Sequence, residues 1–67
     1  MAIRGIGRVL KELRLKRGYS QLELAKRAKI TNVYLSLLET GKNKNPSLAV
    51  LQRLAKALGV PVTELLG

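Results

Sequence analysis

The side chains that could do chemistry in this 67-residue sequence are mostly cations. Thirteen lysines and arginines stand against four glutamates, which gives a formal net charge of +9 at pH 7. Cysteine and histidine are both absent. Without cysteine there is no disulfide and no thiolate metal ligand. Without histidine there is no imidazole metal ligand and no usual general base. The acids Glu12, Glu23, Glu39 and Glu64 are too widely spaced to suggest a carboxylate pair. The composition therefore predicts a protein that is not an enzyme and that holds no metal or cofactor.

The excess of positive charge favours a polyanionic partner, either nucleic acid or an anionic surface. The alternative is a solvated surface rich in Lys and Arg, but such a surface would normally carry matching Glu. No apolar run approaches the ~18 residues of a membrane span, and the N-terminus lacks the long apolar core of a signal peptide. We therefore expect a cytoplasmic protein that associates with the nucleoid and not with a membrane.

The apolar residues recur at helical spacing, and we expect one all-α domain of five short helices over residues 1–67. The first helix ends near Lys16, before Gly18, which is a good C-terminal stop. Gly5 and Gly7 each cost about 1 kcal/mol in a helix, so its first turn is expected to fray. Leu15 lies opposite the apolar stripe, where it is either partly exposed or covered by a neighbouring segment. The stripe itself consists of Ile3, Ile6, Val9, Leu10 and Leu13.

The remaining four helices are marked by their caps. Ser20 with Glu23 three residues later forms a capping box for the second helix, and Thr31 caps the third, which Gly41 closes. Ser47 caps a fourth helix from Leu48 to Leu58, and a fifth, short helix follows Pro61. The buried arc of the fourth helix is expected to contain Leu48, Leu51, Leu54, Ala55 and Leu58. The last helix carries Val62, Leu65 and Leu66.

Residues 21–38 have the spacing of a helix-turn-helix. The fifth position of this stretch is small, Ala25, because the third helix crosses there, and the turn begins at the ninth position, Lys29. A generic helical hairpin needs no small residue at one fixed position, so the helix-turn-helix is favoured. Apolar groups are expected to be buried at Leu24, Ile30, Leu35 and Leu38.

Residues 20–43, SQLELAKRAKITNVYLSLLETGKN, followed by 45–60, NPSLAVLQRLAKALGV, resemble the Cro and phage-repressor (XRE-type) helix-turn-helix family. The resemblance covers the chain from about Ile6 to Leu66 and implies a lambda-repressor-like fold. The loop before Asn45-Pro46 is also similar to that of sporulation-type repressor DNA-binding domains. One departure is Lys29, at a turn position where the family usually has Gly.

The resemblance also implies roles in binding double-stranded DNA. The exposed side of the third helix would read bases in the major groove, where Asn32 suits adenine or a phosphate and Val33 suits a thymine methyl group. For Leu37 three readings stay open: a thymine methyl contact, no contact, or a protein contact. The base-reading residues are Thr31, Asn32, Val33, Ser36 and Leu37. The phosphate-binding residues are Ser20, Gln21, Tyr34, Lys42, Asn43 and Lys44.

Two further sets have structural roles by the same resemblance. Arg14 and Glu39 match an ion pair that ties the first helix to the end of the third. The apolar residues at the end of the chain either finish the core or form a two-fold contact between copies, as the family's last helix often does. This second set is Val60, Val62, Leu65 and Leu66.

The predicted function is therefore a sequence-specific transcriptional regulator, acting as a repressor and as a homodimer on a two-fold operator, with no small-molecule ligand evident. A phage-type repressor and a restriction–modification controller are both candidates. The alternative is a protein-interaction module on the same fold, such as an antitoxin or a bridging factor. Leu15 and Leu37 on outward faces motivate that alternative.

Overall fold

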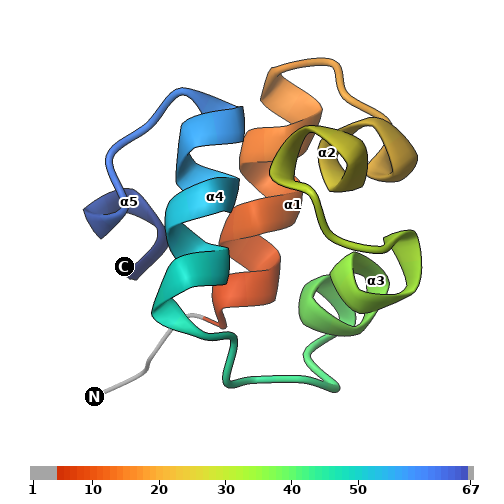
Figure 1. Cartoon of the computed structure of the whole chain (residues 1–67), viewed down its shortest axis with the longest axis vertical. Helices are drawn as coiled ribbons and strands as arrows, with labels where there is room; N and C mark the ends of the chain where they lie inside the picture. Colours follow the sequence, from red (N-terminus) through yellow and green to blue (C-terminus); the bar gives the residue numbers. More distant parts are fainter. Residues whose placement is uncertain (1–4, 67) are drawn as a thin grey trace.

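The computed structural model describes residues 5–66 and contains five α-helices over that range (Figure 1). They are α1 (Ile6–Lys16), α2 (Gln21–Ala28), α3 (Asn32–Thr40), α4 (Leu48–Leu58) and α5 (Thr63–Leu66). Residues 5–66 include no strand, and the all-α, lambda-repressor-like architecture is confirmed. Ile3, which we expect on the first helix, lies outside the described residues. None of these helices has the length and apolar character needed to cross a bilayer.

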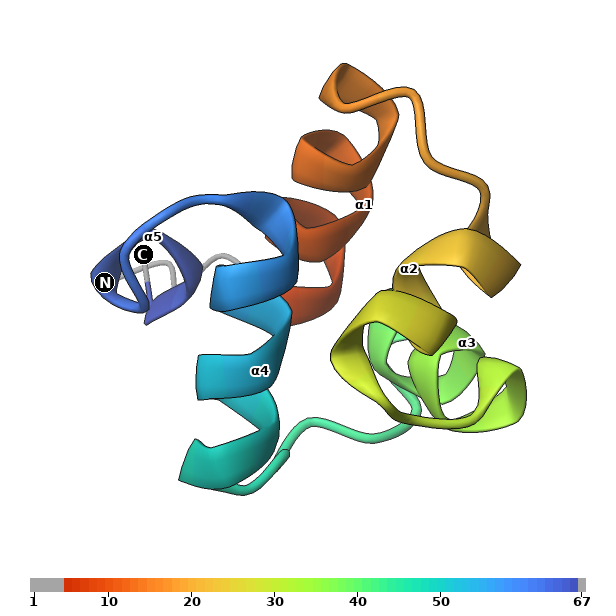
Figure 2. The ribbon, with the colours of Figure 1, turned by 45° about the horizontal axis from the view of Figure 1, so that its top comes forward.

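The helices are arranged so that α2 and α3 form one flank and α5 the other (Figures 1 and 2). The α1 helix packs against α3 and α5, while α4 packs against α2 and α5. The α2 and α3 helices also pack on each other, and the α3–α4 connection runs along one edge of the molecule (Figure 2). The two helices of the helix-turn-helix therefore rest on a base built from α1 and α4.

One apolar core joins all five helices, and most of the predicted arcs are confirmed. Leu24, Leu35 and Leu38 are fully buried, whereas Ile30 is only half-buried. The prediction for Leu48 is wrong, since this side chain is 61% exposed and Val50 is buried in its place. Leu48 is the first residue of α4 and lies at the margin of the stripe formed by the other buried positions. The core residues are Val9, Leu10, Leu24, Ala25, Ala28, Leu35, Leu38, Val50, Leu51, Leu54, Ala55, Leu58 and Leu65.

All three predicted N-caps are present. The hydroxyl oxygens of Ser20, Thr31 and Ser47 each accept from the backbone N–H three residues later, at 3.0, 3.0 and 3.1 Å. The capping box at Ser20 is incomplete, because the Glu23 carboxylate accepts from Arg27 at 3.0 Å on the next turn of α2. Short polar side chains therefore set where α2, α3 and α4 begin.

Gly7 has a role that the sequence did not reveal. It is buried in the first turn of α1, where a Cβ would collide with the carbonyl oxygen of Leu38 and lie 2.8 Å from that of Glu39. No side chain larger than hydrogen fits between these two helices without a backbone shift. The glycine that we expected to weaken α1 therefore permits its close approach to the end of α3.

Candidate nucleic-acid interface

The turn between α2 and α3 is closed by Lys29 in the left-handed conformation, with φ 60° and ψ 42°. Lys29 is the only non-glycine residue with positive φ between residues 5 and 66. The N–H of Ile30 donates to the carbonyl of Ala25 at 3.0 Å, which ends α2 and redirects the chain into α3. Ala25 is 1% exposed, in keeping with the small residue expected where the two helices cross.

The outward side of α3 is neutral and mostly exposed. Thr31, Asn32 and Val33 stand at its start, and Val33 is 69% exposed although it is apolar. Ser36 is half-buried and Leu37 is 37% exposed, and the helical spacing places them on either side of Val33 on this face. The only charged residue of α3, Glu39, is turned into the protein. Hydrogen-bonding groups and two apolar side chains, Val33 and Leu37, are thus presented on a rigid base without a local charge.

The base beneath α3 includes a buried ion pair. Arg14 Nε donates to Glu39 Oε2 at 2.8 Å and Arg14 Nη2 to Glu39 Oε1 at 3.1 Å, with only 11% and 4% of the two side chains exposed. Arg14 Nη1 also donates to the carbonyl of Tyr19 at 3.0 Å, just before α2. The pair expected from the resemblance is therefore present, and it joins α1, α3 and the start of α2.

Gln21 belongs to the same network. It is the first residue of α2 and is half-buried, and its Nε2 donates to Glu39 Oε1 at 3.3 Å. Ser20 and Tyr34 lie close in sequence to the two helix starts, Ser20 exposed and Tyr34 half-buried. The structure therefore engages one amide hydrogen of Gln21 inside the protein and leaves the other for an outside partner.

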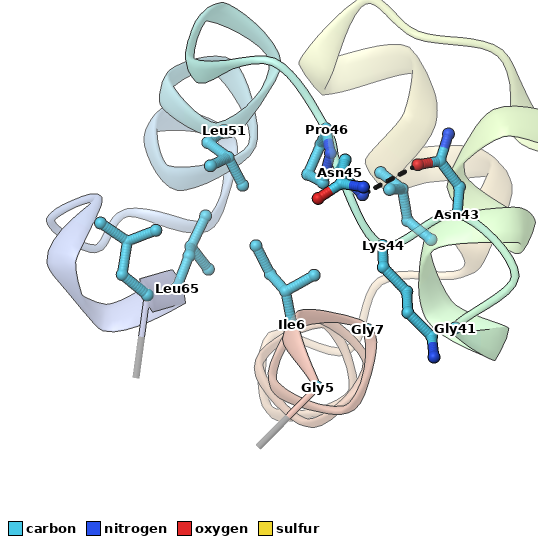
Figure 3. Close-up of a pocket in the computed structure, with 12 residues that line it drawn as sticks. Gly5, Ile6, Gly7, Gly41, Asn43, Lys44, Asn45, Pro46, Leu51 and Leu65 are labelled. Carbon is cyan, nitrogen blue, oxygen red and sulfur yellow. Dashed lines mark hydrogen bonds between the residues drawn. The ribbon is translucent and has the colours of Figure 1, made fainter. Parts of the chain in front are cut away.

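The α3–α4 loop carries exposed cations beside the end of α3. Lys42 and Lys44 are exposed and Asn43 between them is half-buried. Among residues 5–66 neither lysine has an ion-pair partner. The loop also forms one wall of an open hollow of about 520 Å³ between α1, α4 and α5, into which Ile6 points (Figure 3).

The predicted dimer residues lie on the flank opposite α3, around α5 (Figure 1). Leu65 is 1% exposed and completes the core, while Val60 and Val62 are partly buried against it. Leu66 is 62% exposed. Leu65, with Val60 and Val62 packed against the core, therefore fits the interpretation that this segment completes the core. Leu66 alone presents a large apolar side chain outward, where it is free for a contact between copies.

A cation in the last turn of α2 that stacks on the ring of Tyr19, just before the helix, was not foreseen. The Arg27 guanidinium lies 4.5 Å from the centre of the Tyr19 ring and also pairs with Glu23. Tyr19 is half-buried and packs against the core. The i, i+4 spacing of Glu23 and Arg27 was the available signal for the ion pair, but nothing in the sequence places Tyr19 beneath Arg27.

The turn, the crossing of α2 and α3, and the supporting ion pair define a helix-turn-helix protein. A family model described as helix-turn-helix matches residues 10–65, and the chain belongs to that family. The resemblance to Cro and phage-repressor (XRE-type) proteins is thereby confirmed.

The chain is similar to several regulators of this kind. It is 39% identical to the HTH-type transcriptional regulator SinR of Bacillus subtilis over 91% of its own length and 55% of SinR. It is 36% identical to the immunity repressor of Bacillus phage phi105 over 92% of its length and 42% of that protein. The chain therefore spans about half the length of these two curated relatives.

Two solved structures share the fold closely. The structure of SinR, the master regulator for biofilm formation, in complex with DNA matches with a TM-score of 0.90 and 39% identity over 92% of this chain and 98% of that one. The restriction–modification controller protein C.AhdI from Aeromonas hydrophila matches with a TM-score of 0.87 and 36% identity, over 91% of each chain.

Proposed function

We propose that this protein is a transcriptional regulator that binds double-stranded DNA sequence-specifically by placing α3 in the major groove. The observation that carries the proposal is the neutral outward face of α3, held on fully buried Leu35 and Leu38 and bordered by the exposed cations of the α3–α4 loop. A major groove about 12 Å wide admits one helix, and base edges are read by neutral donors, acceptors and methyl contacts. SinR, which has the same fold, is known in complex with DNA.

On this proposal the residues at the start of α3 recognise bases. Asn32 donates to and accepts from adenine, and Val33 packs on a thymine methyl group. Thr31 uses one lone pair of its hydroxyl on the Tyr34 N–H and keeps its own hydrogen for DNA. Ser36 and Leu37 lie further along the helix, where their partial burial limits them to contacts at the edge of the groove.

The phosphates flanking that groove are held from both ends of the helix-turn-helix. Ser20 and Gln21 offer hydrogen bonds at the N-terminus of α2, where the helix dipole favours an anion. Tyr34 contributes its hydroxyl group. Lys42 and Lys44 contribute charge at the other end, with Asn43 between them. These contacts fix the position of α3 without reading sequence.

Binding as a homodimer and repression complete the proposal. One domain offers few base contacts, and two domains on half-sites one helical turn, ~34 Å, apart double them. SinR and the phage phi105 immunity repressor, both similar to this chain, are a regulator and a repressor by name. A protein that occupies a promoter in this way would lie with the nucleoid and exclude polymerase.

Selection of binding sites from random duplex DNA tests the proposal. We expect a half-site that recurs with two-fold symmetry. Asn32→Ala and Val33→Ala are each expected to relax preference at one base pair, at a cost of about 1–3 kcal/mol for the lost contact. Leu15→Ala is the control, because this residue is 59% exposed on α1 and away from α3. Absence of any enriched sequence, with wild-type protein that is folded, would reject the function.

The alternative, a protein-interaction module, is favoured by the exposed apolar side chains Leu15 and Leu22, which are 59% and 51% exposed. Such residues are also common singly on soluble proteins. The same selection separates the two functions, because an interaction module would give no enriched DNA and would instead form a stable complex with one protein.

A further inference from the structure

The loop that follows α3 is tied to the reading helix by its backbone. The N–H of Asn43 donates to the carbonyl of Leu37 at 3.0 Å, and the Thr40 hydroxyl donates to the same carbonyl at 3.3 Å. Leu37 belongs to the outward face of α3, so the position of Asn43 follows that of the helix. The first half of the loop is therefore fixed relative to the face that is proposed to read bases.

The side chain of Asn43 then bends the loop. Its Oδ1 accepts a hydrogen bond from the Asn45 N–H at 3.1 Å, the Asx-turn pattern, and Figure 3 draws this bond across the turn. Lys44 is the residue enclosed by the turn. Pro46 follows with a restricted φ, and Ser47 caps α4. Both ends of the loop are thus anchored, and the Asn43 side chain makes the one side-chain hydrogen bond described within residues 41–46.

We propose that Asn43 is a positioning residue for DNA binding, whose side chain holds Lys44 where it reaches the phosphates beside α3, next to Lys42. The inference rests on the proposed function. Positioning is a different role from the sequence expectation that Asn43 itself grips a phosphate, which only its Nδ2 could do, because its Oδ1 accepts from Asn45. Lysine side chains lose much entropy when they are ordered, and a loop with a preset backbone reduces the ordering cost of binding.

Salt dependence distinguishes a positioning role from a direct contact. A lysine held at a phosphate releases counterions, and each such contact adds about 0.9 to the slope of log affinity against log salt. A neutral amide bound to a phosphate releases none. If Asn43 acts through Lys44, its loss lowers the slope; if it binds phosphate itself, its loss lowers affinity and leaves the slope unchanged.

The experiment measures binding of wild-type protein, Asn43→Ala and Asn43→Ser to a random-sequence duplex over a range of salt concentrations. The Lys42→Ala/Lys44→Ala variant is measured with and without Asn43→Ala. We expect Asn43→Ala to weaken binding about two- to tenfold, the range of one hydrogen bond, and to lower the slope by up to the ~0.9 units of the Lys44 contact. A serine hydroxyl can accept the hydrogen bond from the Asn45 N–H more weakly than Asn43 does. Asn43→Ser should therefore keep part of the affinity and part of the salt slope that Asn43→Ala loses.

The decisive comparison is the background without the lysines. There, Asn43→Ala should have no further effect on affinity or slope. An equal loss in both backgrounds with an unchanged slope, or no loss in either, would overturn the positioning role. Circular dichroism establishes whether each variant is folded. If Asn43→Ala does not fold, the same comparison is made with Asn43→Ser. Wild-type protein that shows no salt-dependent binding at all would instead reject the proposed function.

Discussion

At the scale of single residues, Gly7 shows how a missing Cβ sets the distance between two helices. A Cβ there would collide with the Leu38 carbonyl oxygen, which is backbone and cannot rotate away. We expect Gly7→Ala to lower the free energy of unfolding by about 1–3 kcal/mol, although alanine is the better helix former by about 1 kcal/mol. Urea unfolding followed by circular dichroism measures the change.

Gly5 provides the control for Gly7. A Cβ at Gly5 meets nothing within 4 Å, and the residue is exposed at the N-cap of α1. Gly5→Ala is expected to change stability by less than about 1 kcal/mol, the size of a cap effect. Equal losses for the two variants would show that close contact with α3 is not what selects glycine at position 7.

Lys29 is the opposite case, because a side chain stands at a backbone conformation that glycine adopts with less strain. Its φ of 60° lies in the left-handed region, which costs a non-glycine residue about 1 kcal/mol. We therefore expect Lys29→Gly to raise the free energy of unfolding by about 1 kcal/mol. The control is Lys26→Gly, which removes the same charge inside α2 and should lower stability by about 1 kcal/mol. A loss in both variants would argue against strain at the turn.

The residues that could be predicted from the sequence are those whose behaviour is local. Ser20, Thr31 and Ser47 cap helices because their hydroxyls reach an N–H three residues later, which depends on the chain nearby. Gly7 and Asn43 could not be assigned in this way. The first depends on a carbonyl thirty-one positions away and the second on the direction of a loop.

At the scale of helices, the Arg14–Glu39 pair is what holds α1, α2 and α3 in one arrangement. Both side chains are nearly buried, and the carboxylate also accepts from Gln21. Glu39→Gln leaves the Arg14 charge buried without its counter-charge, and we expect a loss on the order of 3 kcal/mol. Thermal or urea unfolding measures it.

The exposed Glu23–Arg27 ion pair on α2 is the control for the loss of stability expected from Glu39→Gln. Glu23 and Arg27 are 44% and 50% exposed and lie 3.0 Å apart, so solvent screens their attraction. Glu23→Gln is expected to cost at most about 1 kcal/mol. If Glu39→Gln were no more costly than Glu23→Gln, burial of the Arg14–Glu39 pair would not be contributing to the arrangement of the helices.

The helices themselves were predictable, and their packing partners only in part. Caps and apolar periodicity gave all five elements, and the helix-turn-helix spacing placed α2 against α3. That Leu48 stays exposed while Val50 is buried depends on where α4 begins relative to its neighbours. The outward face of α3 was also predictable in outline, because the buried positions Leu35 and Leu38 leave only the other side exposed.

At the scale of the whole molecule, the proposed function would use two opposite flanks. The neutral face of α3 and the cationic α3–α4 loop lie on one side, and α5 lies on the other (Figure 1). Half-sites one helical turn apart lie ~34 Å from each other, and the placement of α5 away from α3 (Figure 1) leaves α3 free to face DNA when two copies meet at α5. Two copies could therefore reach adjacent major grooves if the contact between them lay on the side away from the bases.

Leu66 is the residue that tests such a contact. It is 62% exposed on α5 and is the one large apolar side chain that the predicted dimer set presents outward. If α5 forms the two-fold contact, Leu66→Glu places two carboxylates against each other in an apolar interface and should shift the protein to monomer. Sedimentation measures the shift, and the cooperativity of binding to a two-fold site should fall with it.

Leu15→Glu is the matched control for Leu66→Glu, since it makes the same charge change at a leucine that is 59% exposed on α1. A contact through α5 predicts loss of dimer for Leu66→Glu alone. Equal behaviour of the two variants would place the contact elsewhere, and loss of dimer for Leu15→Glu alone would assign it to the outward face of α1. The half-site spacing found by selection would then have to fit that different arrangement, because moving the two-fold axis moves the two reading helices with it.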